Sequence, residues 1–197
     1  MTARLHDGAP GEEVWCAGTS GLRVTMLDPA ADVEVLHDWV TRPHAGFFGL
    51  GRLTREELRE TYEFVGSLPT HHAYLVRDGE VPVALAQLYH PEDDPVAAAY
   101  DVRPGDVGAH FFRGSEAVAW EVLGPTLVGF AFSRPDVERI VVEPDVRHRA
   151  AIARTAAMGF ELAGAVRFES PHGPKDAMLA FLTRERALAE VVPRSPR

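Results

Sequence analysis

Apolar positions recur along this chain with two different spacings, and each spacing predicts a kind of secondary structure. Apolar runs that alternate with polar residues, or that are short and bounded by Gly, Pro or Asp, are typical of strands, whereas apolar residues three and four apart are typical of helices. The strand pattern occurs at 13–17, 22–27, 72–77, 81–89, 97–102, 106–112, 139–143, 160–168 and 176–181. The helix pattern occurs at 31–40, 55–65, within 115–132 and at 148–158. This mixture predicts an α/β protein.

Three local signals predict where elements begin, turn or end. Thr54 followed by Glu57 forms a capping box, so a helix is expected to start at Arg55. Asp78-Gly79 between two apolar runs is typical of a hairpin turn, because glycine tolerates a positive φ at the loop tip. Gly159 follows a helical pattern and is expected to end that helix in the left-handed conformation.

The helix within 115–132 has two alternative starts. It either begins near Ser115 and includes Pro125, which costs about 3 kcal/mol in a helix interior, or it begins at Pro125, a favoured first position. The second alternative leaves a short helix. Both alternatives are consistent with the sequence.

Composition narrows the class of protein. The 197 residues are 46% hydrophobic and contain no Ser/Gly-rich or charged linker, so one domain over 1–197 is expected, with frayed ends at 1–12 and 190–197.

The net charge of −9 argues against nucleic acid as the main partner. Cys16 is the only cysteine, which excludes an intrachain disulfide and fits a reducing cytoplasm. No apolar run is long enough to span a membrane, and no histidine pattern predicts a metal site.

Two titratable residues stand on or directly after apolar strands. In the strand at 106–112, alternation places Gly108, His110 and Phe112 on one face, so His110 lies beside a glycine where a ligand has room to approach. Glu143 ends the apolar strand at 139–143, and Pro144 turns the chain immediately afterwards. An imidazole, with an ordinary pKa of about 6.5, suits a general base, and a carboxylate can orient it. Hydrogen-bonded structural roles are the alternative for both residues.

Four ordered segments carry a resemblance to a known family. They are 39–44 (WVTRPH), 88–93 (LYHPED), 100–110 (YDVRPGDVGAH) and 141–147 (VVEPDVR), and Gly159-Phe160 and Lys175 follow at the expected places. Together they resemble the GNAT (GCN5-related) N-acyltransferases, and among these the acyltransferases of hydroxamate siderophore biosynthesis. The resemblance implies a mixed, mostly antiparallel sheet of about seven strands flanked by about four helices, with two neighbouring strands splayed where acyl-CoA enters.

The same resemblance implies a reaction. An acetyl, succinyl or similar short acyl group would pass from acyl-CoA to the N-hydroxylated side-chain amine of a lysine, ornithine or diamine, and a hydroxamate would form. His110 and Glu143 would face one cleft as the base and its carboxylate partner, and no metal would be needed. Other enzymes of a siderophore pathway are the expected protein partners, and a monomer and a dimer both remain open.

The resemblance further assigns residues to the two substrates. On the acceptor side it implies Trp39, His44, Tyr89 and Asp145, and on the donor side Arg113, Gly114, Ser115, Arg147 and His148. Five of them have a plainer alternative. It is packing between the first helix and the sheet for Trp39 and His44, a place in an amphipathic strand for Tyr89, a helix cap for Asp145 and a surface ion pair for Arg147. The family usually carries Asn at position 148.

The donor loop departs from the pattern of the superfamily. A glycine-rich turn at a helix N-terminus usually binds the pyrophosphate, whereas this chain reads Arg113-Gly114-Ser115-Glu116-Ala117-Val118. Two further function classes therefore stay open. One is a GNAT acetyltransferase that acts on an ordinary amine of a small molecule or a protein N-terminus. The other is a catalytically weak binding or scaffold member of a biosynthetic complex.

Overall fold

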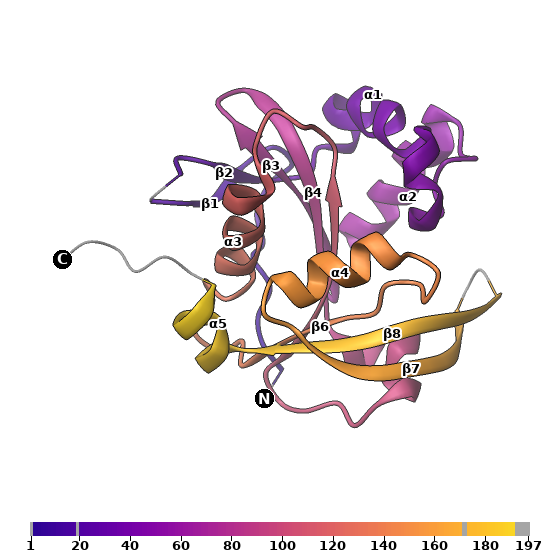
Figure 1. Cartoon of the computed structure of the whole chain (residues 1–197). Coiled ribbons are helices and arrows are strands. Elements are labelled where there is room, and N and C mark those ends of the chain that lie inside the picture. The colour runs from indigo at the N-terminus through magenta and orange to yellow at the C-terminus, as the bar shows by residue number, and fades with distance from the viewer. Residues whose placement is uncertain (1, 19, 171–172, 192–197) are drawn as a thin grey trace.

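A computed structural model describes residues 2–18, 20–170 and 173–191, apart from the side chain of His44. Its centre is one eight-stranded sheet with the order β1-β2-β3-β4-β5-β6-β8-β7 (Figure 1). The strands are β1 (Glu13–Cys16), β2 (Arg23–Met26), β3 (His71–Asp78), β4 (Val81–Tyr89), β5 (Asp106–Arg113), β6 (Arg139–Val142), β7 (Glu161–Ser170) and β8 (Gly173–Thr183). All neighbours pair antiparallel except β5 and β6, which are parallel.

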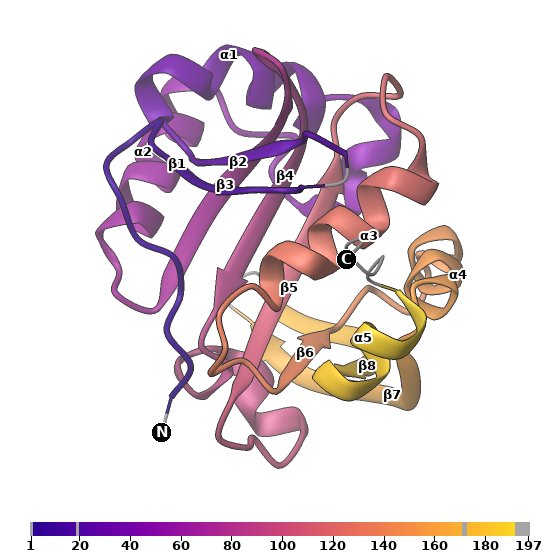
Figure 2. The ribbon, with the colours of Figure 1, turned by 90° about the vertical axis from the view of Figure 1, so that its left-hand side faces the viewer.

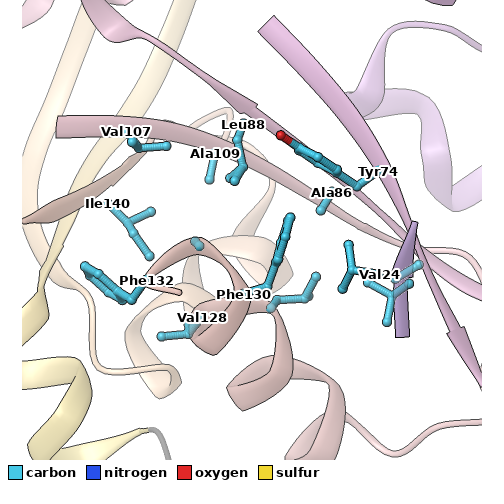
Figure 3. Close-up of a cluster of buried hydrophobic side chains, with 14 of the residues drawn as sticks. Val24, Tyr74, Ala86, Leu88, Val107, Ala109, Val128, Phe130, Phe132 and Ile140 are labelled. Carbon is cyan, nitrogen blue, oxygen red and sulfur yellow. The ribbon is translucent and has the colours of Figure 1, made fainter. Parts of the chain in front are cut away.

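Helices cover both faces of this sheet (Figure 2). They are α1 (Pro29–Val40), α2 (Arg55–Ser67), α3 (Trp120–Ala131), α4 (Arg149–Ala157) and α5 (Arg184–Glu190), with short 3-10 helices η1 (Pro43–Phe48), η2 (Pro91–Asp93) and η3 (Pro95–Ala99). The core under α3 joins Phe130 and Phe132 of the α3 segment to Tyr74, Val107 and Ile140 of the sheet (Figure 3). A second core lies between α1, α2 and the opposite face.

The local signals in the sequence are confirmed. Thr54 and Glu57 form both hydrogen bonds of the capping box at the start of α2. Gly79 has a φ of 57° at the tip of the β3–β4 hairpin, and Gly159 has a φ of 85° directly after α4 and Met158. These features could be predicted from the sequence because each conformation depends on neighbours close in the chain.

Three elements differ from the predictions. The strand predicted at 97–102 is absent; η3 lies there instead, because Pro95 and the Asp94 side chain, which accepts from the Val96 N–H, start a 3-10 turn. Helix α3 begins at Trp120, between the two predicted starts, and contains Pro125. Helix α5 was not predicted, although Thr183 caps it by accepting from the Arg186 N–H.

Part of the N-terminal segment packs against the sheet. Ala3 is 1% exposed, and the carbonyl of His6 accepts a hydrogen bond from the Tyr74 hydroxyl at 2.7 Å. The start of the described chain is therefore attached to the sheet at Ala3 and His6, whereas 9–12 are exposed, and the expectation of a frayed segment at 1–12 stays a prediction. At the other end Glu190 closes α5, and 192–197 lie outside the described residues.

The parallel pair β5 and β6 separates soon after it forms. Pairing joins Asp106, Val107 and Gly108 to Arg139, Ile140 and Val141 and then stops, while β5 continues to Arg113 beside β4. At the closed end, the Arg139 guanidinium donates to both oxygens of the buried Asp106 carboxylate at 2.7 and 2.6 Å. The expected splay between two neighbouring strands is thus present, and it opens just beyond Gly108.

Two glycines of this region lie against aromatic rings. A Cβ added to Gly108 would lie 2.2 Å from the Tyr89 ring, and one added to Gly114 would lie 2.2 Å from the Trp39 ring. Contacts that short do not occur between carbon atoms, so both positions require glycine for close approach. The Tyr89 ring, and not open space for a ligand as expected, thus lies against Gly108, and the Trp39 ring lies against Gly114.

We expect Gly114→Ala to destabilise the fold by about 1–3 kcal/mol, the usual cost of an overpacked site. Gly18→Ala is the matched control, because a Cβ there meets nothing within 4 Å and its φ is not positive. Urea denaturation followed by circular dichroism measures both. An unchanged free energy of unfolding for Gly114→Ala would show that Trp39 moves freely and that the glycine has another purpose.

Candidate active site

His110 and Glu143 meet at the point where β5 and β6 separate. Each lies two residues beyond the last paired positions, Gly108 and Val141, so both side chains project from the same face of the sheet. His110 Nε2 lies 2.7 Å from Glu143 Oε1. The His110 side chain is 38% exposed, whereas that of Glu143 is 3% exposed. The structure therefore brings together the two residues that the sequence singled out, with the imidazole toward solvent.

Two more side chains bind the same carboxylate. Lys175 of β8 donates from Nζ to Oε1 of Glu143 at 2.8 Å, and Tyr89 of β4 donates from its hydroxyl to Oε2 at 3.2 Å. These four residues are called the Glu143 network below. The sequence marked Lys175 only through the family resemblance. It is the only lysine among the 20 lysine and arginine residues, a feature that the sequence analysis did not use.

The charges around Glu143 determine its protonation. Burial alone would raise the pKa of this carboxyl, but His110 and then Lys175, through charge and hydrogen bonds, lower it to about 2. Burial, and next the Glu143 charge, raise the pKa of Tyr89 well above its ordinary value. At neutral pH Glu143 is therefore ionised and only accepts hydrogen bonds. The Tyr89 hydroxyl keeps its proton and donates a hydrogen bond to Glu143.

This protonation assigns the tautomer of a neutral His110. Lys175 also lowers the pKa of Glu143 through its charge and a hydrogen bond, so beside a neutral His110 an ionised Glu143 can only accept, and the ring nitrogen that faces it, Nε2, carries the proton. The lone pair of the neutral ring is then on Nδ1. His110 is thus arranged as a base whose free nitrogen points away from its carboxylate partner.

Tyr89 is placed differently from the acceptor-side role implied for it. Tyr89 is only 2% exposed. Its ring centroid lies 5.5 Å from that of His71 and 5.1 Å from that of His110. Its hydroxyl donates a hydrogen bond to Glu143. A substrate has no access to that hydroxyl. Tyr89 instead holds Glu143 in position, and Gly108 makes room for its ring.

The other acceptor-side residues are not gathered at His110. Trp39 is 3% exposed and stacks on Phe112, so it follows the packing alternative. Asp145 binds the backbone N–H and guanidinium of Arg147, which lowers the pKa of Asp145, and it does not cap α4. The side chain of His44 lies outside the described residues.

The predicted phosphate loop is used internally. The N–H groups of Gly114 and Ser115 both donate to the Val83 carbonyl at 3.0 Å. The Arg113 guanidinium binds the carbonyls of Ser115 and Val118. In the described structure these two N–H groups are therefore already used by a carbonyl, and the donor role implied for Arg113, Gly114 and Ser115 stays a prediction that this arrangement does not favour. The sequence did not predict these hydrogen bonds, because Val83 lies in a different strand, β4.

The remaining donor-side residues form a cluster with η1. Arg147 is paired with Asp145 and lies 5.8 Å from the Phe47 ring, and His148 stacks on Phe47 with centroids 4.4 Å apart. Burial and then Arg154 lower the pKa of His148. A hollow of about 250 Å³ is lined by Pro43, Gly46, Phe47 and Arg147. Arg147 thus lines this hollow and is paired with Asp145, whereas His148 packs against its Phe47 ring.

The N-terminus of α3 has features of an anion site that the sequence did not point to. Its N-cap residue, Ala119, offers no side-chain hydrogen bond, so first-turn N–H groups lack a side-chain cap. Arg154 of α4 lies 5.8 Å from the ring of Trp120, the first residue of α3. A helix N-terminus and a guanidinium both favour an anion.

Comparison with known proteins identifies the fold. The family model described as acetyltransferase (GNAT) domain matches residues 28–168. An uncharacterized protein from Bacillus halodurans has a TM-score of 0.77 at 19% identity, with 92% of this chain and 95% of that chain covered. The aminoglycoside acetyltransferase AAC(6')-Ib in complex with coenzyme A and kanamycin has a TM-score of 0.66 at 23% identity, with 86% and 98% covered.

A third similar structure is spermidine N-acetyltransferase from Vibrio cholerae in complex with CoA and spermine. Its TM-score is 0.63 at 14% identity, with 85% of this chain and 98% of that chain covered. A search of curated protein sequences found no match. In the described part of the chain, no helix has the length and apolar character needed to cross a membrane.

The GNAT fold that the resemblance implied is confirmed, with eight strands in the described sheet where about seven were expected. Because the family model covers most of the chain, from α1 to β7, the comparison identifies more than a shared architecture. The chain belongs to the acetyltransferase (GNAT) domain family.

Proposed function

We propose that this protein transfers a short acyl group from acyl-CoA to the nitrogen of an N-hydroxylated amine, the reaction that forms a hydroxamate. The observation that carries the proposal is the His110–Glu143 pair at the opening of the splay, with the free nitrogen of an accessible imidazole beside a buried, ionised carboxylate. The lysine, ornithine or diamine skeleton of the acceptor follows from the resemblance of the four sequence segments to siderophore acyltransferases.

The acceptor's chemistry fits a single base. A hydroxylamine nitrogen is much less basic than an alkylamine, so it arrives neutral at pH 7 and has one proton to lose when it attacks the thioester. Nδ1 of His110 takes that proton, and the Glu143 carboxylate stabilises the imidazolium that results. The new N–C bond forms first and gives a tetrahedral oxyanion. When this intermediate collapses the C–S bond breaks, and the proton passes from the imidazolium to the departing thiolate of CoA.

The donor would lie along the free edge of β5. Beyond Gly108 no strand of the described residues pairs with this edge on its β6 side, so backbone groups there could bind a pantetheine arm. A strand N–H near His110 would stabilise the tetrahedral oxyanion. The phosphates of CoA, whether the acyl group is acetyl or succinyl, would lie at the N-terminus of α3 with Arg154.

A second candidate function is acetylation of an ordinary amine. Similar folds belong to an aminoglycoside acetyltransferase and a spermidine N-acetyltransferase, both of which act on amines. An alkylamine arrives protonated and must lose a proton before it can attack. Turnover of such an acceptor would rise toward pH 9, whereas turnover of a hydroxylamine would level off once His110 is neutral.

The acceptor is tested with purified full-length protein, acetyl-CoA or succinyl-CoA, and N-hydroxylysine, N-hydroxyornithine and N-hydroxycadaverine beside their parent amines. Release of CoA and the mass of the product are followed. We expect turnover with hydroxylated acceptors only. Turnover confined to the parent amines would establish the second candidate, and silence across the panel would contradict both reactions and favour a binding or scaffold role.

We expect His110→Ala and Glu143→Gln each to lower kcat by about 10²-fold or more, because the base or its stabilising charge is lost. His37→Ala, in α1 away from the splay, is the control and should leave kcat unchanged. Thermal unfolding of each variant separates loss of chemistry from loss of fold. Near-normal turnover of both folded variants would remove the pair from the mechanism.

A further inference from the structure

We propose that Lys175 is a positioning residue that keeps His110 in its unprotonated, base-competent form by sharing the charge of Glu143. This inference rests on the proposed role of His110 as the base. Lys175 Nζ and His110 Nε2 bind the same oxygen, Oε1 of Glu143, at 2.8 and 2.7 Å. The lysine thus competes directly with the imidazole for one negative charge.

The geometry shows why that competition is strong. The Glu143 side chain is 3% exposed, so water screens its interactions little, and the Lys175 side chain is 30% exposed. Lys175 reaches the carboxylate from β8 and His110 reaches it from β5, so neither depends on the other for its place. Nζ also lies 5.7 Å from the centre of the Phe168 ring, which helps to keep the ammonium on the Glu143 side of the strand.

The charge balance gives the direction of the effect. With His110 neutral, Glu143 and Lys175 together carry no net charge, so a proton added to His110 creates a net positive cluster. Without Lys175, the same proton would neutralise a buried carboxylate and would be bound more tightly. The other groups near His110 change little: Tyr89 stays protonated, and His71 and Asp94, 3.7 Å apart, lie behind the Tyr89 ring. Asp145, near Lys175, is paired with Arg147.

The choice of lysine agrees with this role. Of the 20 lysine and arginine residues, Lys175 is the only lysine, and the other 19 are arginines. An arginine presents a planar fork that tends to engage both carboxylate oxygens, whereas an ammonium acts as a compact charge on one. Lysine thereby leaves Oε2 of Glu143 to the Tyr89 hydroxyl.

The test compares Lys175→Met, which removes the charge, with Lys175→Arg, which keeps it. In wild type, log(kcat/KM) falls on the acidic side as His110 becomes protonated. We expect Lys175→Met to move this acidic limb to higher pH by about one unit, the scale for a unit charge within hydrogen-bonding range of the pair. Turnover would then be about tenfold lower at pH 6 and close to wild type at pH 9. Lys175→Arg keeps the positive charge, although its fork can also engage Oε2, so its acidic limb would stay closer to that of the wild type than the limb of Lys175→Met.

A merely structural role would give a different result. If Lys175 only stabilised the fold, Lys175→Met would lower kcat equally at every pH and leave the acidic limb in place. That outcome would overturn the inference. Thermal unfolding of both variants identifies any loss of folded protein before the profiles are compared.

An independent measurement needs no turnover. Proton NMR of the His110 Cε1–H, assigned by its absence from His110→Asn, follows protonation of the ring directly. We expect its titration midpoint to rise by about one pH unit in Lys175→Met. An unmoved midpoint contradicts the inference even if the enzyme is active. A raised midpoint in a protein that acylates none of the acceptors supports the charge sharing while the proposed function fails.

Discussion

The site depends on a buried carboxylate that is stabilised from three sides. An ionised Glu143 away from water would be strongly unfavourable by itself, and here it accepts hydrogen bonds from His110, Lys175 and Tyr89. These donors lie on β5, β8 and β4, so the carboxylate connects strands on both sides of the splay. Where the β5 and β6 backbones no longer bind each other, this side-chain network sets the distance between them.

The splay is closed at one end by a second buried ion pair. Asp106 and Arg139 lie at the starts of β5 and β6, and their two hydrogen bonds hold the strands in register before they separate. Gly108, the last paired residue of β5, leaves room for the Tyr89 ring, which in turn places a hydroxyl on Glu143. The result is an opening between two strands that is closed at one end by the Asp106–Arg139 pair and has His110 and Glu143 where the strands separate.

The sequence predicted features that depend on residues close together in the chain, and it did not predict those that depend on residues far apart. The capping box at Thr54, the turn at Gly79 and the face of His110 follow from residues a few positions apart, and all are present. The contacts of the predicted phosphate loop could not be predicted from neighbouring residues, because they involve residues far away in the sequence. The N–H of Gly114 binds the Val83 carbonyl, and its Cα packs on Trp39. The inward turn of Tyr89 likewise depends on a glycine in the neighbouring strand.

The arrangement of protons in the Glu143 network bears on which acceptor it can serve. Glu143, with a pKa of about 2, is a poor base at neutral pH, Tyr89 is held protonated, and Lys175 is paired with Glu143. Nδ1 of His110 is therefore the one basic atom of the network that faces outward. One such atom can take one proton per turnover, which is all that a neutral hydroxylamine must lose. A protonated alkylamine has two protons to lose, so water would have to take the first before the imidazole could take the second.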